Sequence, residues 1–156
     1  MTPRAFLPLL TILCASVAVA SETATVTRVV DGDTLVVDIA GQEERVRLIG
    51  VDTPETVHPK KPVEYFGKEA SAFTKRIAEG ETVRLESDPQ NSNRDRYNRL
   101  LRYVYLPDGT CLNAEIIRQG YGFAYVKYPF SRMEEYRLLE RSAREGERGL
   151  WHQSEP

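Results

Sequence analysis

The sequence predicts an α+β domain that is mainly β, with five strands and three α-helices. Three alternating, β-branched runs come first, at 24–31, 33–39 and 43–51. A helical stretch follows them, then two more strands and two more helices. Strand, strand, strand, helix, strand, strand is the order of elements in a five-stranded OB-fold barrel, so we expect that architecture.

The first three strands should form a meander whose turns, at 31–33 and 40–42, bring acidic residues together. Antiparallel pairing across the second turn puts the start of the second strand beside the end of the third. Asp33 then lies near Asp52, and the proline that follows forces an extended exit that carries Glu55 along the same rim. Carboxylates this close repel one another unless a cation or a shared proton intervenes. A hard divalent cation is the simpler solution.

The first helix is predicted over 63–78, where the apolar residues Ala70, Phe73 and Ile77 fall on one face and charged residues on the other. The glycine at position 80 ends it. A fourth strand is expected at 81–87, because its apolar residues alternate with polar ones.

A long polar loop at 88–98 leads to the fifth strand, which we predict at 100–106. Loops of this length without regular structure are usually functional or mobile. The loop brings three arginines and a tyrosine to the start of the strand, which makes an anion-binding candidate. These residues are Arg94, Arg96, Tyr97 and Arg99. On this segment alone, a solvated charged loop remains the alternative.

Two helices should complete the domain. Asn113 is expected to cap a short helix that runs to Gln119, where a glycine stops it. Ser131 and Glu134 have the spacing of a capping box at the start of the last helix. After that helix, the apolar residues 150–151 should fold back onto the domain.

The first twenty residues have the pattern of an export signal. Arg4 precedes an uncharged run at 5–20, which ends in the small-x-small sequence Ala-Val-Ala. We therefore predict a secretory signal peptide at 1–20 and one domain at 21–156. An uncleaved anchor is the alternative, but the run is shorter than the ~20 residues that a spanning helix needs. The protein should be exported, to the periplasm or the medium, with no stable membrane association after cleavage.

Composition restricts the chemistry of the chain. With 21 basic and 23 acidic residues, the net charge of −2 argues against a broad surface that coats nucleic acid, although a local basic cleft is compatible with it. His58 and His152 have no partner at metal spacing, so a histidine-based zinc site is not expected. Cys111 is the only cysteine after the predicted signal, and we expect it to be buried as a small apolar residue.

Seven blocks of sequence, in the same order, resemble the staphylococcal nuclease (thermonuclease) family. They are 30–34 (VDGDT), 47–56 (RLIGVDTPET), 58–61 (HPKK), 67–75 (GKEASAFTK), 95–99 (DRYNR), 113–115 (NAE) and 118–120 (RQG). The match covers nearly all of the predicted mature chain. The resemblance implies a calcium-dependent endonuclease that cleaves single-stranded or frayed DNA and RNA and leaves 3′-phosphates.

The resemblance also implies a role for each acidic residue of the rim. Asp33 and Asp52 would bind Ca²⁺ through their carboxylates, and Thr53 through its backbone carbonyl. Asp31 would support them through hydrogen bonds, and Glu55 would act as the general base or orient the attacking water. Calcium takes oxygen ligands, so aspartates and a carbonyl suit it where histidine would not.

Arginines and aromatic residues complete the implied site. Arg47 and Arg99 would clamp the phosphate, since each presents a fixed fork of donors. The implied substrate-binding residues are Lys60, Lys61, Arg96, Tyr97, Tyr125 and Tyr128. Taken alone, the two lysines are more often solvated loop charges and the last two tyrosines more often core. Asn98 replaces the family's glycine before Arg99, and asparagine tolerates the turn conformation well.

A nuclease-like barrel that binds nucleic acid or protein without catalysis is the competing function. Such a module would be expected to lack one of the catalytic acids or arginines, whereas this chain has all of them. An EF-hand is less favoured still, because Val36 stands where its loop needs glycine. Paired carboxylates could also serve a glycosidase, but that does not explain two arginines on the same rim. No feature demands an oligomer, so we expect a monomer.

Overall fold

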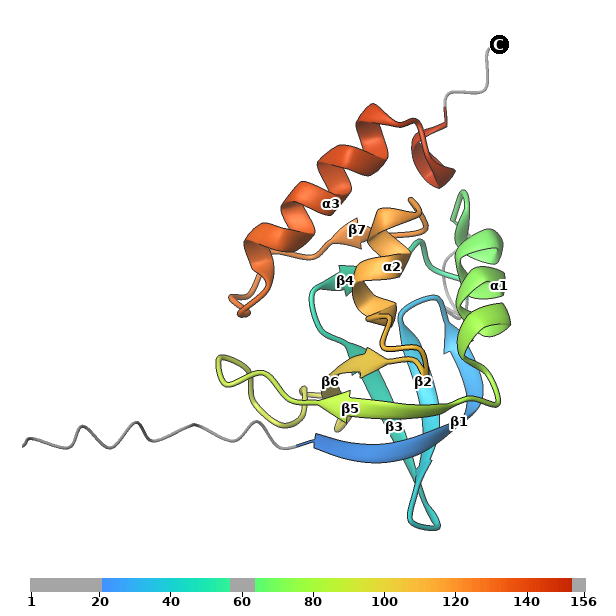
Figure 1. The fold of residues 1–156 in the computed structure, drawn as a ribbon, viewed down its shortest axis with the longest axis vertical. Helices are drawn as coiled ribbons and strands as arrows, with labels where there is room; N and C mark the ends of the chain where they lie inside the picture. Colours follow the sequence, from blue (N-terminus) through green and yellow to red (C-terminus); the bar gives the residue numbers. More distant parts are fainter. Residues whose placement is uncertain (1–20, 57–63, 153–156) are drawn as a thin grey trace, which may run out of the picture.

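The computed structural model describes residues 21–56 and 64–152. Five strands close into a barrel in the order β1-β2-β3-β6-β5 (Figure 1). Their bounds are β1 Ser21–Asp31, β2 Thr34–Ile39, β3 Gln42–Leu48, β5 Thr82–Glu86 and β6 Leu100–Tyr105. The predicted α+β class, with a five-stranded barrel and three α-helices, is confirmed.

The three helices gather at one end of the barrel (Figure 1). They are α1 Gly67–Ala78, α2 Leu112–Arg118 and α3 Met133–Glu145, followed by a short 3-10 helix, η1 Gly149–Trp151. The first of them packs on β1 and on α2, while α3 packs on α2 and β7. Tyr136 of α3 also contacts Tyr103 of the barrel strand β6. The second helix lies between α1 and α3 and contacts both.

Strand pairing brings the predicted rim together. The antiparallel pair β2–β3 aligns Thr34 with Arg47, so the start of one strand lies beside the end of the other, as predicted. A parallel pair, β3–β6, closes the barrel and aligns Arg47 with Leu101. Closure thus places the loop that ends at Arg99 next to the acidic turns.

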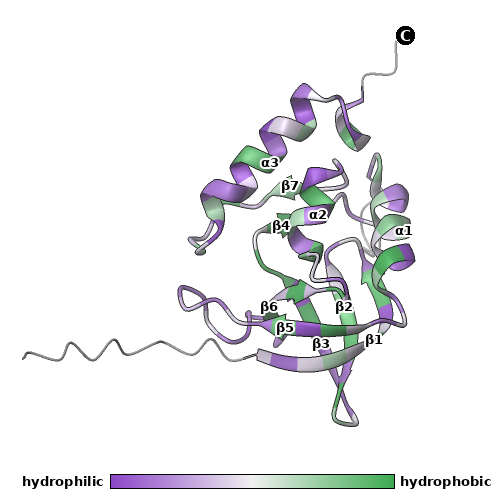
Figure 2. Ribbon diagram, viewed as in Figure 1, coloured by the Kyte–Doolittle hydropathy of each residue, from purple (hydrophilic) through white to green (hydrophobic). Residues whose placement is uncertain are grey.

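The barrel interior follows from the period of two in the strands. Completely buried residues of the strands, such as Val26, Leu35, Val46 and Leu85, belong to the core cluster. Hydrophobic and hydrophilic segments both occur along the strand ribbons (Figure 2). A slip of one residue in the register would turn these side chains out and the polar ones in. The predicted burial of Cys111 is also confirmed.

The predicted third strand, 43–51, is in fact two strands. Its chain breaks after Leu48 because Gly50 adopts a left-handed conformation with φ 71°. The next residues form β4 Val51–Asp52, which pairs with β7 Phe123–Ala124 in a small second sheet. This sheet was not predicted, because two-residue strands leave no periodic signal.

The predicted N-caps of the last two helices are wrong. Cys111 occupies the N-cap of α2, and the Asn113 side chain is buried inside the first turn, where its amide nitrogen donates to the carbonyl oxygens of Ile49 and Arg102. At α3 the N-cap is Arg132, and Ser131 donates its hydroxyl to Asp88 instead of to the helix. Both polar side chains form tertiary contacts, which a local sequence pattern cannot reveal.

The other element bounds differ from the predictions by a few residues. The first helix begins at Gly67, later than predicted, because Phe66 has a φ of 65° and interrupts the helix. The predicted signal peptide, Lys60 and Lys61 lie outside the described residues. Within 21–56 and 64–152, no helix has both the length and the apolar character that crossing a membrane requires.

Candidate active site

The predicted metal-binding and catalytic residues line one small pocket. It has a volume of about 300 Å³ and opens where the β1–β2 turn, the end of β3 and the start of β6 meet. Its lining consists of Val30, Asp31, Asp33, Thr34, Arg45, Arg47, Asp52, Thr53, Glu55, Tyr97 and Arg99. Residues far apart in the sequence therefore form a single acidic and basic site.

Asp33 is held from two sides. Its Oδ2 accepts hydrogen bonds from the backbone N–H of Thr53 at 2.9 Å and from the Thr53 hydroxyl at 3.2 Å. The other carboxylate oxygen accepts the Thr34 hydroxyl at 3.0 Å. The carboxylate is thus fixed against Thr53, the residue directly after Asp52, which strand pairing predicts as the neighbour of Asp33.

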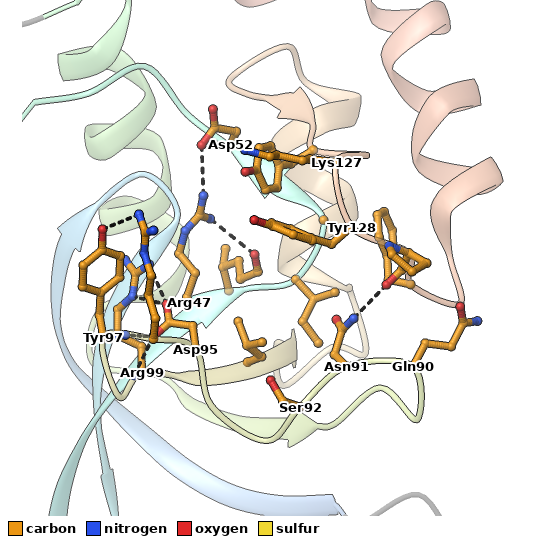
Figure 3. Close-up of a pocket in the computed structure, with 18 residues that line it drawn as sticks. Arg47, Asp52, Gln90, Asn91, Ser92, Asp95, Tyr97, Arg99, Lys127 and Tyr128 are labelled. Carbon is orange, nitrogen blue, oxygen red and sulfur yellow. Dashed lines mark hydrogen bonds and ion pairs between the residues drawn. The ribbon is translucent and has the colours of Figure 1, made fainter.

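Arg47 lies between the two predicted metal-binding aspartates. One terminal nitrogen is 3.2 Å from Asp33 Oδ2. The other is 3.0 Å from Asp52 Oδ1 (Figure 3). The first nitrogen also donates to the carbonyl oxygen of Val51 at 2.6 Å. The guanidinium therefore bridges the ends of two strands and two carboxylates, which brings Asp33 and Asp52 to the same cation.

Asp31 accepts hydrogen bonds from two neighbouring segments of the rim. Its Oδ1 accepts the Gly32 N–H at 2.8 Å and the Thr56 hydroxyl at 2.9 Å. Burial raises the pKa of Asp31 to about 6, opposed by these two hydrogen bonds and reinforced by the charge of Asp33. Burial also raises the pKa of Asp52, although Arg47 opposes the shift. The pKa values of Asp31 and Asp52 therefore depend on their burial and on the neighbouring charges of Asp33 and Arg47.

The Glu55 main chain is fixed by a reciprocal pair of hydrogen bonds. Its N–H donates to Glu64 Oε2 at 3.0 Å, and the Glu64 N–H donates to the Glu55 carbonyl oxygen at 2.9 Å. Glu55 itself is half-buried on the pocket wall. A carboxylate at this position can reach a water inside the pocket.

Asp95 orients Arg99, a role that was not predicted. Nε and a terminal nitrogen of Arg99 both lie 2.7 Å from Asp95 Oδ2, while Asp95 Oδ1 accepts the N–H groups of Tyr97 and Arg99. Asn98 has a φ of 63°, which agrees with the expected left-handed turn. An aspartate that opens a tight turn four residues before an arginine was the available signal.

Arg94 does not belong to the anion site, contrary to the prediction from the loop. Both of its terminal nitrogens lie 2.8 Å from the carboxylate of Glu44, and it also donates to the Asn98 carbonyl oxygen. It anchors the loop to β3. Arg96 and Tyr97 are exposed, and the Arg96 guanidinium donates to the Tyr97 hydroxyl at 2.6 Å.

A larger pocket of about 560 Å³ adjoins the first (Figure 3). Tyr125 and Tyr128 line it, with ring centroids 6.1 Å apart and the rings edge to face. The opposite wall is polar and was not predicted in detail; it comprises Gln90, Asn91 and Ser92, with Lys127 on the tyrosine side. Arg47, Asp52, Tyr97 and Arg99 line both pockets, so the two spaces meet at the predicted phosphate clamp.

The donor set suits a hard cation. Among residues 21–56 and 64–152, no three histidine, cysteine or acidic side chains group as a metal site. Two of the acidic side chains, Asp33 and Asp52, are nevertheless held together by one positively charged group, the Arg47 guanidinium. The expected donors, two carboxylates and a backbone carbonyl, are all oxygen, as Ca²⁺ prefers.

Known proteins are similar in sequence to this chain over most of its length. Residues 45–153 match the family described as staphylococcal nuclease homologue. The thermonuclease of Staphylococcus intermedius is 43% identical over 140 residues, covering 87% of this chain and 80% of that protein. The thermonuclease of Staphylococcus hyicus is 41% identical over 131 residues, covering 83% and 76%. Endonuclease YncB of Bacillus subtilis is 36% identical over 132 residues, covering 83% of this chain and 62% of that protein.

Proposed function

Since the chain belongs to the staphylococcal nuclease family and is a nuclease, a hydrolase of phosphodiester bonds, we propose that it is a calcium-dependent endonuclease of DNA and RNA. It prefers single strands and leaves 3′-phosphates. One observation carries this proposal: Asp33, Asp52, Glu55, Arg47 and Arg99 line the same pocket of about 300 Å³.

The two arginines suit the charge that develops during the reaction. Attack on a phosphodiester produces a five-coordinate phosphorus with additional negative charge on its oxygens. Arg47 and Arg99 border the junction of the two pockets, and each is held by a carboxylate partner. A guanidinium held in this way can direct two donors at one phosphate, which an ammonium group cannot do.

Glu55 is the residue that we assign to the attacking water. Its main chain is fixed by the reciprocal hydrogen bonds with Glu64, and the residue lines the small pocket. A general base must come within hydrogen-bond reach of the proton that it removes, and a water in the pocket would satisfy this requirement. Glu55 therefore acts as the base or orients the water in line with the leaving group.

Asp33, Asp52 and the Thr53 carbonyl would hold the metal ion. When bound, Ca²⁺ would supply positive charge to the phosphate and help to orient the water. Asp31 keeps Thr56 and the turn at Gly32 in place, and so preserves the spacing of the acidic rim.

The larger pocket is the proposed nucleoside site. Tyr125 and Tyr128 offer aromatic surfaces for an unpaired base, and stacking of this kind tolerates any base. Entry of a base into this pocket requires that it leave a duplex, which favours single strands. Arg96 and Tyr97 would contact a second phosphate, and Lys60 and Lys61 would border the substrate.

We also propose that the enzyme is exported and that it acts as a monomer. The predicted signal peptide at 1–20 would direct the enzyme to the periplasm or the medium. Its substrates would then be DNA and RNA outside the cytoplasm, and no stable membrane association would remain after cleavage of the signal.

Hydrolysis of single-stranded DNA by residues 21–156 tests the proposal, with calcium, with magnesium and with chelator. Glu55→Gln serves as the active-site variant, and Glu69→Gln, exposed on α1, as its control. We expect calcium-dependent cleavage that falls by roughly 10²-fold or more in Glu55→Gln and is unchanged in Glu69→Gln. A folded protein that binds DNA but does not cleave it with calcium would instead be a binding module.

A further inference from the structure

Arg45 lines the small pocket but has no part in the function proposed above. Its side chain is exposed on β3, and no carboxylate of the described residues lies within salt-bridge distance of it. The other two arginines of the pocket are already paired, Arg47 with two aspartates and Arg99 with Asp95. Arg45 is therefore the guanidinium of this pocket whose charge has no acidic partner within the described part of the chain.

A second arginine lies in the same cross-strand row. The register of the first three strands aligns Arg28 with Val36 and Val36 with Arg45. Val36 is only 1% exposed, yet it is not a member of the core cluster inside the barrel. Alternation along β2 puts it on the outer face, where the aliphatic stems of the two flanking arginines can cover it. Arg28 is also exposed and has no carboxylate partner among the described residues.

The row formed by Arg28, Val36 and Arg45 has no second arginine row beyond it on the side away from the pocket. Towards the pocket, the next row contains Asp31, Thr34 and Arg47, and its acid belongs to the pocket itself. Away from the pocket, the next row contains Thr25, Asp38 and Glu43, of which two are acidic. A phosphate is attracted to the arginine row and repelled by the acidic row, so the surface is suited to one additional phosphate and not to a long strand.

Arg45 lies close enough to Arg47 to meet a neighbouring phosphate of the nucleic-acid strand that Arg47 would bind. Arg45 and Arg47 are two residues apart on one face of β3, roughly 7 Å along the strand. Arg45 lines the small pocket but not the larger one, whereas Arg47 lines both. A substrate whose base occupies the larger pocket and whose scissile phosphate meets Arg47 would continue past Arg45 on the other side.

We propose that Arg45, assisted by Arg28, binds the phosphate next to the scissile one, on the side opposite the nucleoside pocket. This inference rests on the proposed nuclease function and specifies its substrate: a strand with a phosphate on that side is bound better than one that ends at the scissile bond. The contact sets a minimum length for efficient cleavage.

Substrates that differ by one phosphate test the proposal. A dinucleoside monophosphate has only the scissile phosphate, and the same compound with a 5′- or a 3′-terminal phosphate has one more on a defined side. In Arg45→Gln we expect KM to rise about tenfold for one of the two phosphorylated substrates and to stay unchanged for the other two, with kcat preserved. Arg28→Gln should change the same substrate to a smaller extent, and Arg137→Gln, exposed on α3, should change none.

Binding without turnover gives an independent readout. With chelator present, the salt dependence of the Kd for a labelled oligothymidylate should lose a slope of about 0.7 in Arg45→Gln, the share of one phosphate in a single strand. Arg45→Lys should restore that slope, because it keeps the charge. Equal changes for all three small substrates, or an unchanged salt slope, would overturn the proposal. If the unaltered protein binds but does not cleave, the nuclease function fails while the slope still decides the role of Arg45.

Discussion

At the scale of single residues, the site depends on side chains that serve two partners at once. Arg47 uses different nitrogens for Asp33 and Asp52, and Asp95 uses one oxygen for the Arg99 side chain and the other for the backbone of the turn. Such pairs fix the orientation of the guanidinium group as well as the position of its charge. The arrangement of donors, and not the sum of the charges, is therefore what a conservative substitution would change.

Replacing either clamp arginine by lysine tests this point. Arg47→Lys and Arg99→Lys keep the charge but remove the planar fork, so we expect kcat/KM on single-stranded DNA to fall by roughly 10²–10³-fold. Arg137→Lys on α3 is the matched control and should retain full activity, and circular dichroism checks that all three variants are folded. Near-normal turnover in either clamp variant would refute the role of the fork.

At the scale of elements, the end of α2 and the start of η1 fit each other closely. Gly120 has a φ of 76°, and its carbonyl oxygen accepts the Leu150 N–H at 2.8 Å. A Cβ at Gly120 would collide with the Arg148 carbonyl oxygen. The apolar residues 150–151 therefore do fold back as predicted, and Trp151 packs edge to face on Phe123.

Gly120→Ala should therefore be much more harmful than the same change at Gly109. Both glycines have positive φ, but nothing lies within 4 Å of a Cβ at Gly109. We expect Gly109→Ala to lower the free energy of unfolding by about 1–2 kcal/mol, the cost of the backbone conformation. Gly120→Ala adds the collision and should lower it by at least ~3 kcal/mol in urea denaturation. Equal losses would mean that the contact with η1 contributes nothing.

Local patterns predicted the elements better than their ends. Strand alternation and the stripe of α1 located the barrel and the helices, because these signals repeat within a few residues. The cap assignments failed because Asn113 and Ser131 bond to residues distant in sequence. The same holds for the site. The proximity of Asp33 and Asp52 follows from one meander, whereas the lack of an acidic partner for Arg45 among the described residues depends on which acids the fold brings near it.

At the scale of the whole molecule, a buried carboxylate joins the barrel to the C-terminal helices. Asp88 is 3% exposed and accepts hydrogen bonds from the Tyr103 hydroxyl at 2.5 Å, the Ser131 N–H at 2.7 Å and the Gln90 N–H at 2.7 Å. Burial alone would raise its pKa, but these hydrogen bonds outweigh burial and lower it. One side chain thus holds β6, the loop after β5 and the entry to α3 together.

Asp88→Asn should lower the free energy of unfolding by about 2 kcal/mol at neutral pH, because charged acceptors make the stronger hydrogen bonds. The pKa of Asp88 is lower in the folded state than in the unfolded state. Its stabilisation is therefore complete above the unfolded pKa, about 4, and is lost as pH falls through the folded value. Urea denaturation across this range should show the two proteins converging in acid. A difference independent of pH would contradict the ionic role, and Glu69→Gln, exposed on α1, is the control.

The parallel pairing of β3 with β6 has a consequence for when the protein acquires activity. Arg47 and Arg99 come from different halves of the sequence, and they line one pocket only after this pairing closes the barrel. A nascent or unfolded chain contains both arginines but not the pocket that they line. Whatever chemistry the two arginines perform together therefore depends on β6 joining the barrel.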